Sequence, residues 1–144
     1  MSLELAVKEM YRLKAERNWD KLYFAIDLHG TIIEPGRLKK LNVYHEAQLG
    51  LQFLTERPEI VLILFTSTLP SMLTEFYSWC ELNQIKFDYF NENPECVGHN
   101  RQGDYTRKFY FNLVLDDRAG FNYKEDWNIV VGSIVKYSLL TTLK

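Results

Sequence analysis

Three short apolar runs, each followed by acidic or hydroxyl-bearing residues, constrain the fold of this chain most strongly. The runs lie at 21–26, 60–65 and 111–115 and consist almost entirely of apolar and aromatic residues. Such runs are typical of strands buried on both faces of a parallel sheet. Segment 44–56 has apolar residues at helical spacing, and segment 70–82 begins with a proline, which a first helical turn tolerates. The alternation predicts an α/β fold, namely a three-layer α/β/α sandwich with a Rossmann-like, mainly parallel sheet.

Four further segments complete the predicted topology. Residues 1–17 carry apolar side chains at helical spacing and are expected to form an amphipathic helix. Residues 85–90 and the apolar residues 129–132 are expected to form two more short strands, with a short helix closing the chain. Segment 91–106 is rich in Asn, Gly, Pro and charged residues, so we expect a loop there.

Length, charge and cysteine content narrow the classes of protein to consider. A chain of 144 residues fits one domain, which we expect to cover residues 1–144. Its net charge of −2 supplies no general attraction to nucleic acid or to anionic membranes. The longest apolar run, 60–65, is far too short to cross a bilayer. With two cysteines and no secretory leader, we expect a reduced, cytoplasmic protein without a membrane partner.

The residues that follow the three apolar runs are the candidate site. Asp27 follows the first run, Thr66 and Ser67 end the second, and Asp116 and Asp117 follow the third. In open parallel sheets, ligands bind at the carboxyl ends of the strands. If the three strands are neighbours, these side chains therefore converge on one place.

Such a cluster suits phosphoryl transfer. A carboxylate such as Asp27 can attack a phosphoryl group and form an aspartyl-phosphate. Repulsion between the carboxylate and the phosphate requires a cation, and Mg²⁺ prefers carboxylate oxygens such as those of Asp116 and Asp117. A hydroxyl from the middle cluster and the ammonium of Lys108 would hold the phosphate oxygens in the transition state.

The same segments resemble the motifs of the haloacid dehalogenase-like phosphohydrolases. That family has an apolar strand followed by Asp-x-Asp-Gly-Thr, and this chain has FAIDLHGT at 24–31. The second motif, a strand ending in Thr or Ser, is matched by LILFTS at 62–67, and the fourth, a strand ending in acidic residues, by LVLDD at 113–117. Lys108 is the best placed candidate for the lysine of the third motif. The motifs stand in the family order and span about two-thirds of the chain.

The resemblance implies a role for each of these residues. Asp27 would be the nucleophile and a ligand of Mg²⁺, and Thr66 would bind the phosphate. Lys108 would neutralise the phosphoaspartate. Asp116 and Asp117 would hold the metal, directly or through water.

His29 departs from the family pattern. Its backbone carbonyl would still be a metal ligand, but its side chain replaces the Asp that usually serves as general acid and base. An unperturbed histidine titrates near ~6.5, so His29 can take over this role near neutral pH. The alternative is a catalytically impaired module that binds phosphate or a partner, and the sequence leaves both readings open.

The spacing between motifs leaves no room for the cap domain that many family members carry. Segment 31–60 accommodates a loop and one helix, and segment 68–108 a helix, a short strand and a loop. An uncapped site favours a bulky phosphorylated substrate, such as a protein or a polynucleotide end, or a lid supplied by another subunit of an oligomer.

Other phosphate-handling proteins fit less well. Receiver domains also use an Asp, Mg²⁺, a hydroxyl and a Lys, but they carry the acidic pair on the first strand. This chain has the single Asp first and the pair last. A P-loop protein would require Gly-x-x-x-x-Gly-Lys, which is absent. Taken singly, Asp27 also fits a helix or turn cap, and Lys108 a solvated surface residue.

Overall fold

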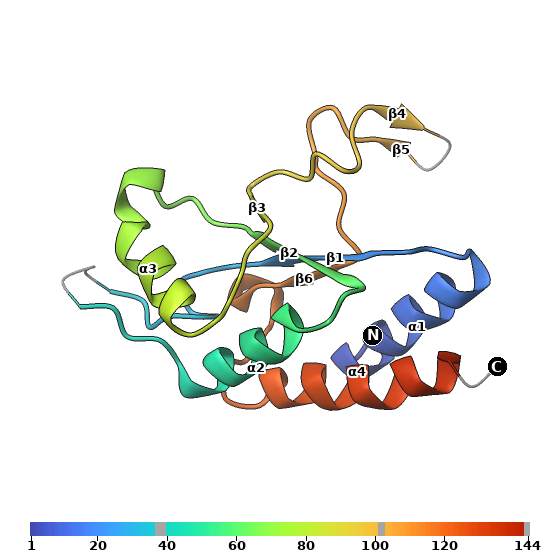
Figure 1. Cartoon of the computed structure of the whole chain (residues 1–144), viewed down its shortest axis with the longest axis horizontal. Helices are drawn as coiled ribbons and strands as arrows, with labels where there is room; N and C mark the ends of the chain where they lie inside the picture. The colour runs from blue at the N-terminus through green and yellow to red at the C-terminus, as the bar shows by residue number, and fades with distance from the viewer. Residues whose placement is uncertain (37–39, 101–102, 143–144) are drawn as a thin grey trace.

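The computed structural model describes residues 1–36, 40–100 and 103–142. A four-stranded parallel sheet in the order β3-β2-β1-β6 lies at its centre (Figure 1). The strands of this sheet are β1 (Leu22–Ile26), β2 (Ile60–Leu64), β3 (Tyr89–Phe90) and β6 (Leu113–Leu115). The helices are α1 (Leu3–Glu16), α2 (His45–Thr55), α3 (Thr74–Leu82) and α4 (Asp126–Thr142). This arrangement confirms the predicted Rossmann-like α/β fold.

The register of the sheet aligns the carboxyl ends of its three central strands. Ile26, the last residue of β1, pairs with Leu64 of β2 and with Leu115 of β6. The backbone N–H of Asp27 donates to the carbonyl of Leu115 at 2.9 Å. Asp27 and Asp116 therefore leave adjacent strands at the same level, as the predicted convergence of strand ends requires.

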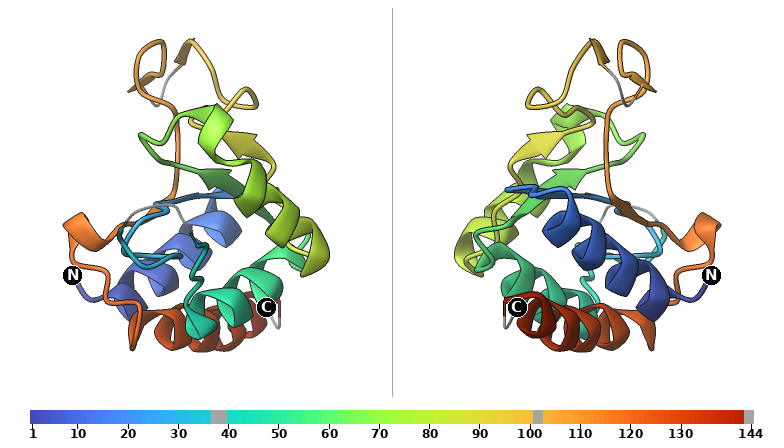
Figure 2. Two further views of the ribbon diagram at one scale, coloured as in Figure 1. Left: turned by 90° about the vertical axis from the view of Figure 1, so that its left-hand side faces the viewer. Right: turned by 90° about the vertical axis from the view of Figure 1, so that its right-hand side faces the viewer.

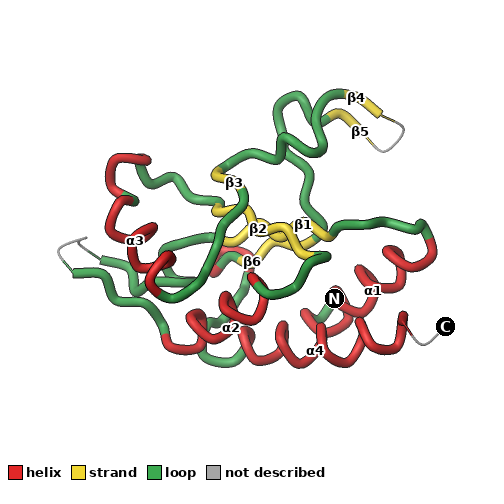
Figure 3. Tube along the Cα trace, in the orientation of Figure 1, coloured by secondary structure: helices red, strands yellow, loops and turns green. Residues whose placement is uncertain are grey.

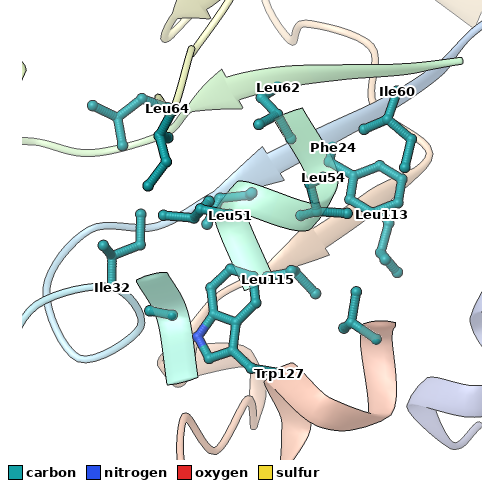
Figure 4. Packing of buried hydrophobic residues seen from close by; sticks show 14 of the residues in the cluster. Phe24, Ile32, Leu51, Leu54, Ile60, Leu62, Leu64, Leu113, Leu115 and Trp127 are labelled. Carbon is teal, nitrogen blue, oxygen red and sulfur yellow. The ribbon is translucent and has the colours of Figure 1, made fainter. Parts of the chain in front are cut away.

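One helical layer and the sheet enclose the main hydrophobic core. Helices α1, α2 and α4 lie together on the same side of the sheet (Figures 1 and 2). Phe24 and Leu115 from the sheet, Leu51 from α2 and Trp127 from α4 are all buried in this core (Figure 4). The Trp127 indole N–H donates to the backbone carbonyl of Thr31 at 2.9 Å, so its buried polar group is satisfied.

The opposite face of the sheet is covered by a loop layer. Side chains alternate along a strand, so the buried Ala25 and Ile63 point away from the helical layer. Residues 91–100 and 103–112 pass on that side (Figures 1 and 2). The ring of Tyr110 meets the ring of Tyr23 edge-on, with 5.9 Å between the ring centroids. Within the described residues this third layer is an aromatic loop rather than a set of helices. It includes the short hairpin strands β4 (His99–Asn100) and β5 (Gly103–Asp104).

The predicted strand at 129–132 is wrong, because these residues lie inside α4. The run of β-branched residues there resembles a strand. Burial follows helical spacing instead, with Trp127, Val130 and Ile134 buried against α1 and α2. The packing of one face of the segment against two other helices outweighs the strand preference of its β-branched side chains.

Two other elements differ in extent from the prediction. The expected helix at 70–82 is divided into a 3₁₀ turn, η1 (Pro70–Met72), and α3. The expected strand at 85–90 is reduced to β3, and a loop precedes it (Figure 3). Among the described residues, no helix is long and apolar enough to span a membrane.

Candidate active site

A pocket of about 430 Å³ lies at the carboxyl ends of β1, β2 and β6. It brings together the residues from all three strand ends that the sequence singled out. The lining residues are Asp27, His29, Pro35, Phe65, Thr66, Ser67, Asp116, Asp117 and Arg118.

Three carboxylates form the acidic centre of this pocket. Oxygen atoms of Asp27, Asp116 and Asp117 lie within 4.8 Å of one another. Burial, together with the negative charge of Asp116, raises the pKa of Asp27 from 3.8 to about 7. Like charges held this close need a proton or a cation between them. Oxygen donors at this spacing suit a divalent cation such as Mg²⁺.

Gly30 and Thr31 position two of the carboxylates. The Thr31 hydroxyl accepts from the backbone N–H of Asp117 at 3.1 Å and donates to Asp27 at 3.5 Å. Thr31 is itself fixed, because it is fully buried and its carbonyl accepts from Trp127. Gly30 has φ +82°, and a Cβ added there would lie 2.4 Å from a carboxylate oxygen of Asp117. In the first motif, the glycine therefore leaves room for the Asp117 carboxylate, and the threonine connects Asp27 to Asp117.

The Asp116 carboxylate is oriented by the turn that follows it. Asp116 caps the 3₁₀ turn η2 (Asp117–Ala119), and its Oδ1 accepts from the backbone N–H of Arg118 at 2.9 Å. Gly120 ends the turn in the left-handed region, at φ +96°. The turn brings Asp117 and Arg118 to the pocket, and both residues line it.

A chain of hydroxyl groups connects the end of β2 to His29. The Thr66 and Thr68 hydroxyls lie 3.0 Å apart, and Nε2 of His29 lies 3.1 Å from the Thr68 hydroxyl. Asn91 holds the backbone of Thr66 from both sides, accepting from its N–H and donating to its carbonyl. Thr66 is buried, whereas Ser67 is exposed at the pocket wall. The contact between Thr68 and His29 was not anticipated, although Thr68 ends the same hydroxyl run in the sequence.

The two cationic residues near the motifs lie in different places. Lys108 is exposed and does not line the pocket, and its ammonium lies 5.5 Å from the ring centroid of Phe111. Arg118 does line the pocket. Sequence reasoning missed Arg118, and the available signal was its position directly after the acidic pair. The role expected of the His29 carbonyl toward a metal stays a prediction.

Comparison with known proteins supports the fold and leaves the family open. No family model and no curated protein matches this chain. One solved structure, of a conserved protein coded by a locus of Bacteroides thetaiotaomicron, is 26% identical with a TM-score of 0.60. The match covers 82% of this chain and 92% of that one. The chain is thus similar over most of its length to an α/β protein, and the haloacid dehalogenase-like family remains a resemblance carried by its motifs.

Proposed function

We propose that this chain is a Mg²⁺-dependent phosphohydrolase that cleaves phosphomonoesters through an aspartyl-phosphate on Asp27. The observation that carries the proposal is the acidic cluster of Asp27, Asp116 and Asp117 beside the Thr66 hydroxyl, at three aligned strand ends. When bound, Mg²⁺ would neutralise the charge between the nucleophile and the phosphate. All three carboxylates would hold it, together with the His29 carbonyl.

In the first step, a carboxylate oxygen of Asp27 attacks phosphorus and the bond to the leaving oxygen breaks. The leaving oxygen takes a proton from the protonated His29 ring, which lines the same pocket. Thr66 and the exposed Ser67 line the same pocket, and their hydroxyl groups would hold the phosphoryl oxygens.

In the second step, water attacks the phosphorus of the aspartyl-phosphate. The neutral His29 ring takes a proton from that water, and the bond from phosphorus to Asp27 breaks. Inorganic phosphate leaves, and both Asp27 and the protonated His29 ring are restored. One histidine thus acts as acid in the first step and as base in the second.

The open position of the pocket supports a bulky phosphorylated substrate. Between the first and second motifs the described chain contains α2 and short turns, and between the second and fourth it contains α3 and the layer on the far face of the sheet. Neither segment, as far as it is described, forms a cap domain over the carboxyl ends. The net charge of −2 does not favour nucleic acid as that substrate.

A substrate panel tests the proposal. The purified chain is incubated with Mg²⁺ and phosphomonoesters that range from small esters to phosphopeptides, with Asp27→Asn and chelator as controls. We expect release of inorganic phosphate that depends on Mg²⁺, and an acid-stable phosphoenzyme that Asp27→Asn does not form. If Asp27→Asn turns over substrate as fast as the wild type, Asp27 is not the nucleophile. Phosphate binding without any turnover would favour the catalytically impaired module instead.

A further inference from the structure

A phosphate site built around three carboxylates requires positive charge from the protein as well as from a metal ion. Lys108 was expected to provide it, but this residue is exposed and absent from the pocket lining. Its ammonium lies above the face of Phe111, in the layer that covers the far side of the sheet. Among the described residues that line the pocket, Arg118 is the one arginine or lysine.

The backbone around Arg118 fixes the origin of its side chain. Its N–H donates to the carboxylate of Asp116 at 2.9 Å, within the same 3₁₀ turn that carries Asp117. The side chain therefore starts one residue beyond the acidic pair. Among the described residues, no ion pair engages the Arg118 guanidinium, so it is free to meet an incoming anion.

The chemistry of arginine suits this position. The guanidinium is planar, carries its charge at every pH of interest, and can donate two parallel hydrogen bonds to a pair of phosphate oxygens. We propose that Arg118, rather than Lys108, is the cation that holds the phosphoryl oxygens in this pocket. This inference rests on the proposed function for its catalytic consequence, but its binding consequence can be measured without turnover.

The test compares Arg118→Gln, Arg118→Lys and Lys108→Gln, with Arg12→Gln as the matched control. Arg12 is an exposed arginine of α1 that pairs with Glu9 and Glu16 on the helix surface, outside the pocket. Three quantities are measured for each variant. Two are calorimetric: the binding of Mg²⁺, and the binding of inorganic phosphate in the presence of Mg²⁺. The third is kcat/KM for a phosphomonoester that the wild type hydrolyses.

We expect Arg118→Gln to weaken phosphate binding and to lower kcat/KM by about 10²-fold, the size typical of removing one preorganised donor. Arg118→Lys should lose less phosphate affinity and less kcat/KM than Arg118→Gln, because lysine keeps the positive charge but not the two parallel donors. Binding of Mg²⁺ should be unchanged or tighter in Arg118→Gln, since a neighbouring positive charge opposes a cation. A variant with a damaged pocket would instead lose both ligands.

Three results from the variants would overturn the inference. They are an unchanged phosphate affinity in Arg118→Gln, a larger loss of phosphate affinity in Lys108→Gln than in Arg118→Gln, and a parallel loss of Mg²⁺ and phosphate binding in Arg118→Gln. Absence of phosphate binding by the wild type would overturn it as well. Failure of the proposed function is a separate result. If the wild type hydrolyses nothing but binds phosphate through Arg118, the hydrolase proposal fails and the assignment of Arg118 stands.

Discussion

At the scale of single residues, the contact between His29 and Thr68 connects the proposed acid and base to the end of β2 that is proposed to bind phosphate. Nε2 of His29 lies 3.1 Å from the Thr68 hydroxyl, which in turn meets the Thr66 hydroxyl. The ring of His29 is therefore held by a side chain from a different strand end. Thr68 would act through His29, as a positioning residue.

Thr68→Val should disturb proton transfer more than substrate binding. We expect kcat/KM for alkyl phosphates, whose leaving oxygens need a proton, to fall by roughly 10-fold. For 4-nitrophenyl phosphate, whose leaving group needs little protonation, kcat/KM should change little. Steady-state kinetics on the two substrate types measures the difference. Thr68→Ser keeps the hydroxyl and should restore the wild-type ratio, whereas equal losses on both substrates would refute a role in positioning His29.

The sequence predicts the buried part of this site better than its rim. Asp27, Thr66 and Asp116 follow apolar strands, and parallel neighbouring strands must bring their ends together. The positions of Arg118 and Lys108 depend on a turn and on a loop layer, whose paths no periodic pattern reveals. The lysine was assigned by its order in the chain, which does not determine its place in space.

At the scale of secondary structure, the contact between α2 and α4 depends on a glycine. A Cβ added at Gly50 of α2 would lie 2.4 Å from Cε3 of Trp127, the buried tryptophan of α4. The missing side chain lets the indole pack directly against the backbone of α2. Trp127 also donates to the Thr31 carbonyl, so this packing supports the loop that positions Asp27 and Asp117.

Gly50→Ala should therefore destabilise the protein despite the better helix propensity of alanine. Overpacking a core costs about 1–3 kcal/mol, whereas replacing glycine in a helix gains only about 0.5–1 kcal/mol. We expect a net loss of about 1 kcal/mol in the free energy of unfolding, measured by urea denaturation. Gly132→Ala in α4 is the matched control, because a Cβ there meets nothing within 4 Å. Gly132→Ala should raise the free energy of unfolding. If Gly50→Ala raises it too, the ring of Trp127 can move aside and the predicted overpacking does not occur.

The elements that sequence reasoning placed correctly have an unambiguous pattern, either a helical period or a short continuous apolar run. The helix at the N-terminus and the strands β1 and β2 match their predicted positions closely. Helix α4 was divided between a strand and a short helix, because apolar residues occur around its whole circumference, as the exposed Val135 and Leu139 show. Which of its faces is buried is decided by α1 and α2, and that information lies elsewhere in the chain.

At the scale of the whole molecule, the acidic cluster links the stability of the protein to pH and, under the proposed function, to metal binding. The pKa of Asp27 is raised from 3.8 to about 7 in the folded protein. A raised pKa means that the folded state binds this proton more tightly than the unfolded state does. The stabilising contribution is therefore fully present below pH ~4 and is lost as pH rises toward ~7. Above that range, the metal-free protein must hold Asp27 ionised beside Asp116 and Asp117.

Mg²⁺ should reverse this loss, because it binds the ionised carboxylates of the folded state and not those of the unfolded chain. We expect the rise in Tm on adding Mg²⁺ to be larger at pH 8 than at pH 5.5, where protons compete for Asp27. Differential scanning calorimetry with and without chelator measures the Tm at both pH values.

Other groups also titrate in this pH range, so the informative quantity is the difference in Tm between the wild type and Asp27→Asn. Asparagine removes both the charge repulsion at position 27 and one proposed metal ligand. Metal-free Asp27→Asn should therefore gain stability relative to the wild type as pH rises. Its rise in Tm on adding Mg²⁺ should be smaller than that of the wild type. A Mg²⁺ effect of equal size in both proteins would show that the cation binds outside the cluster.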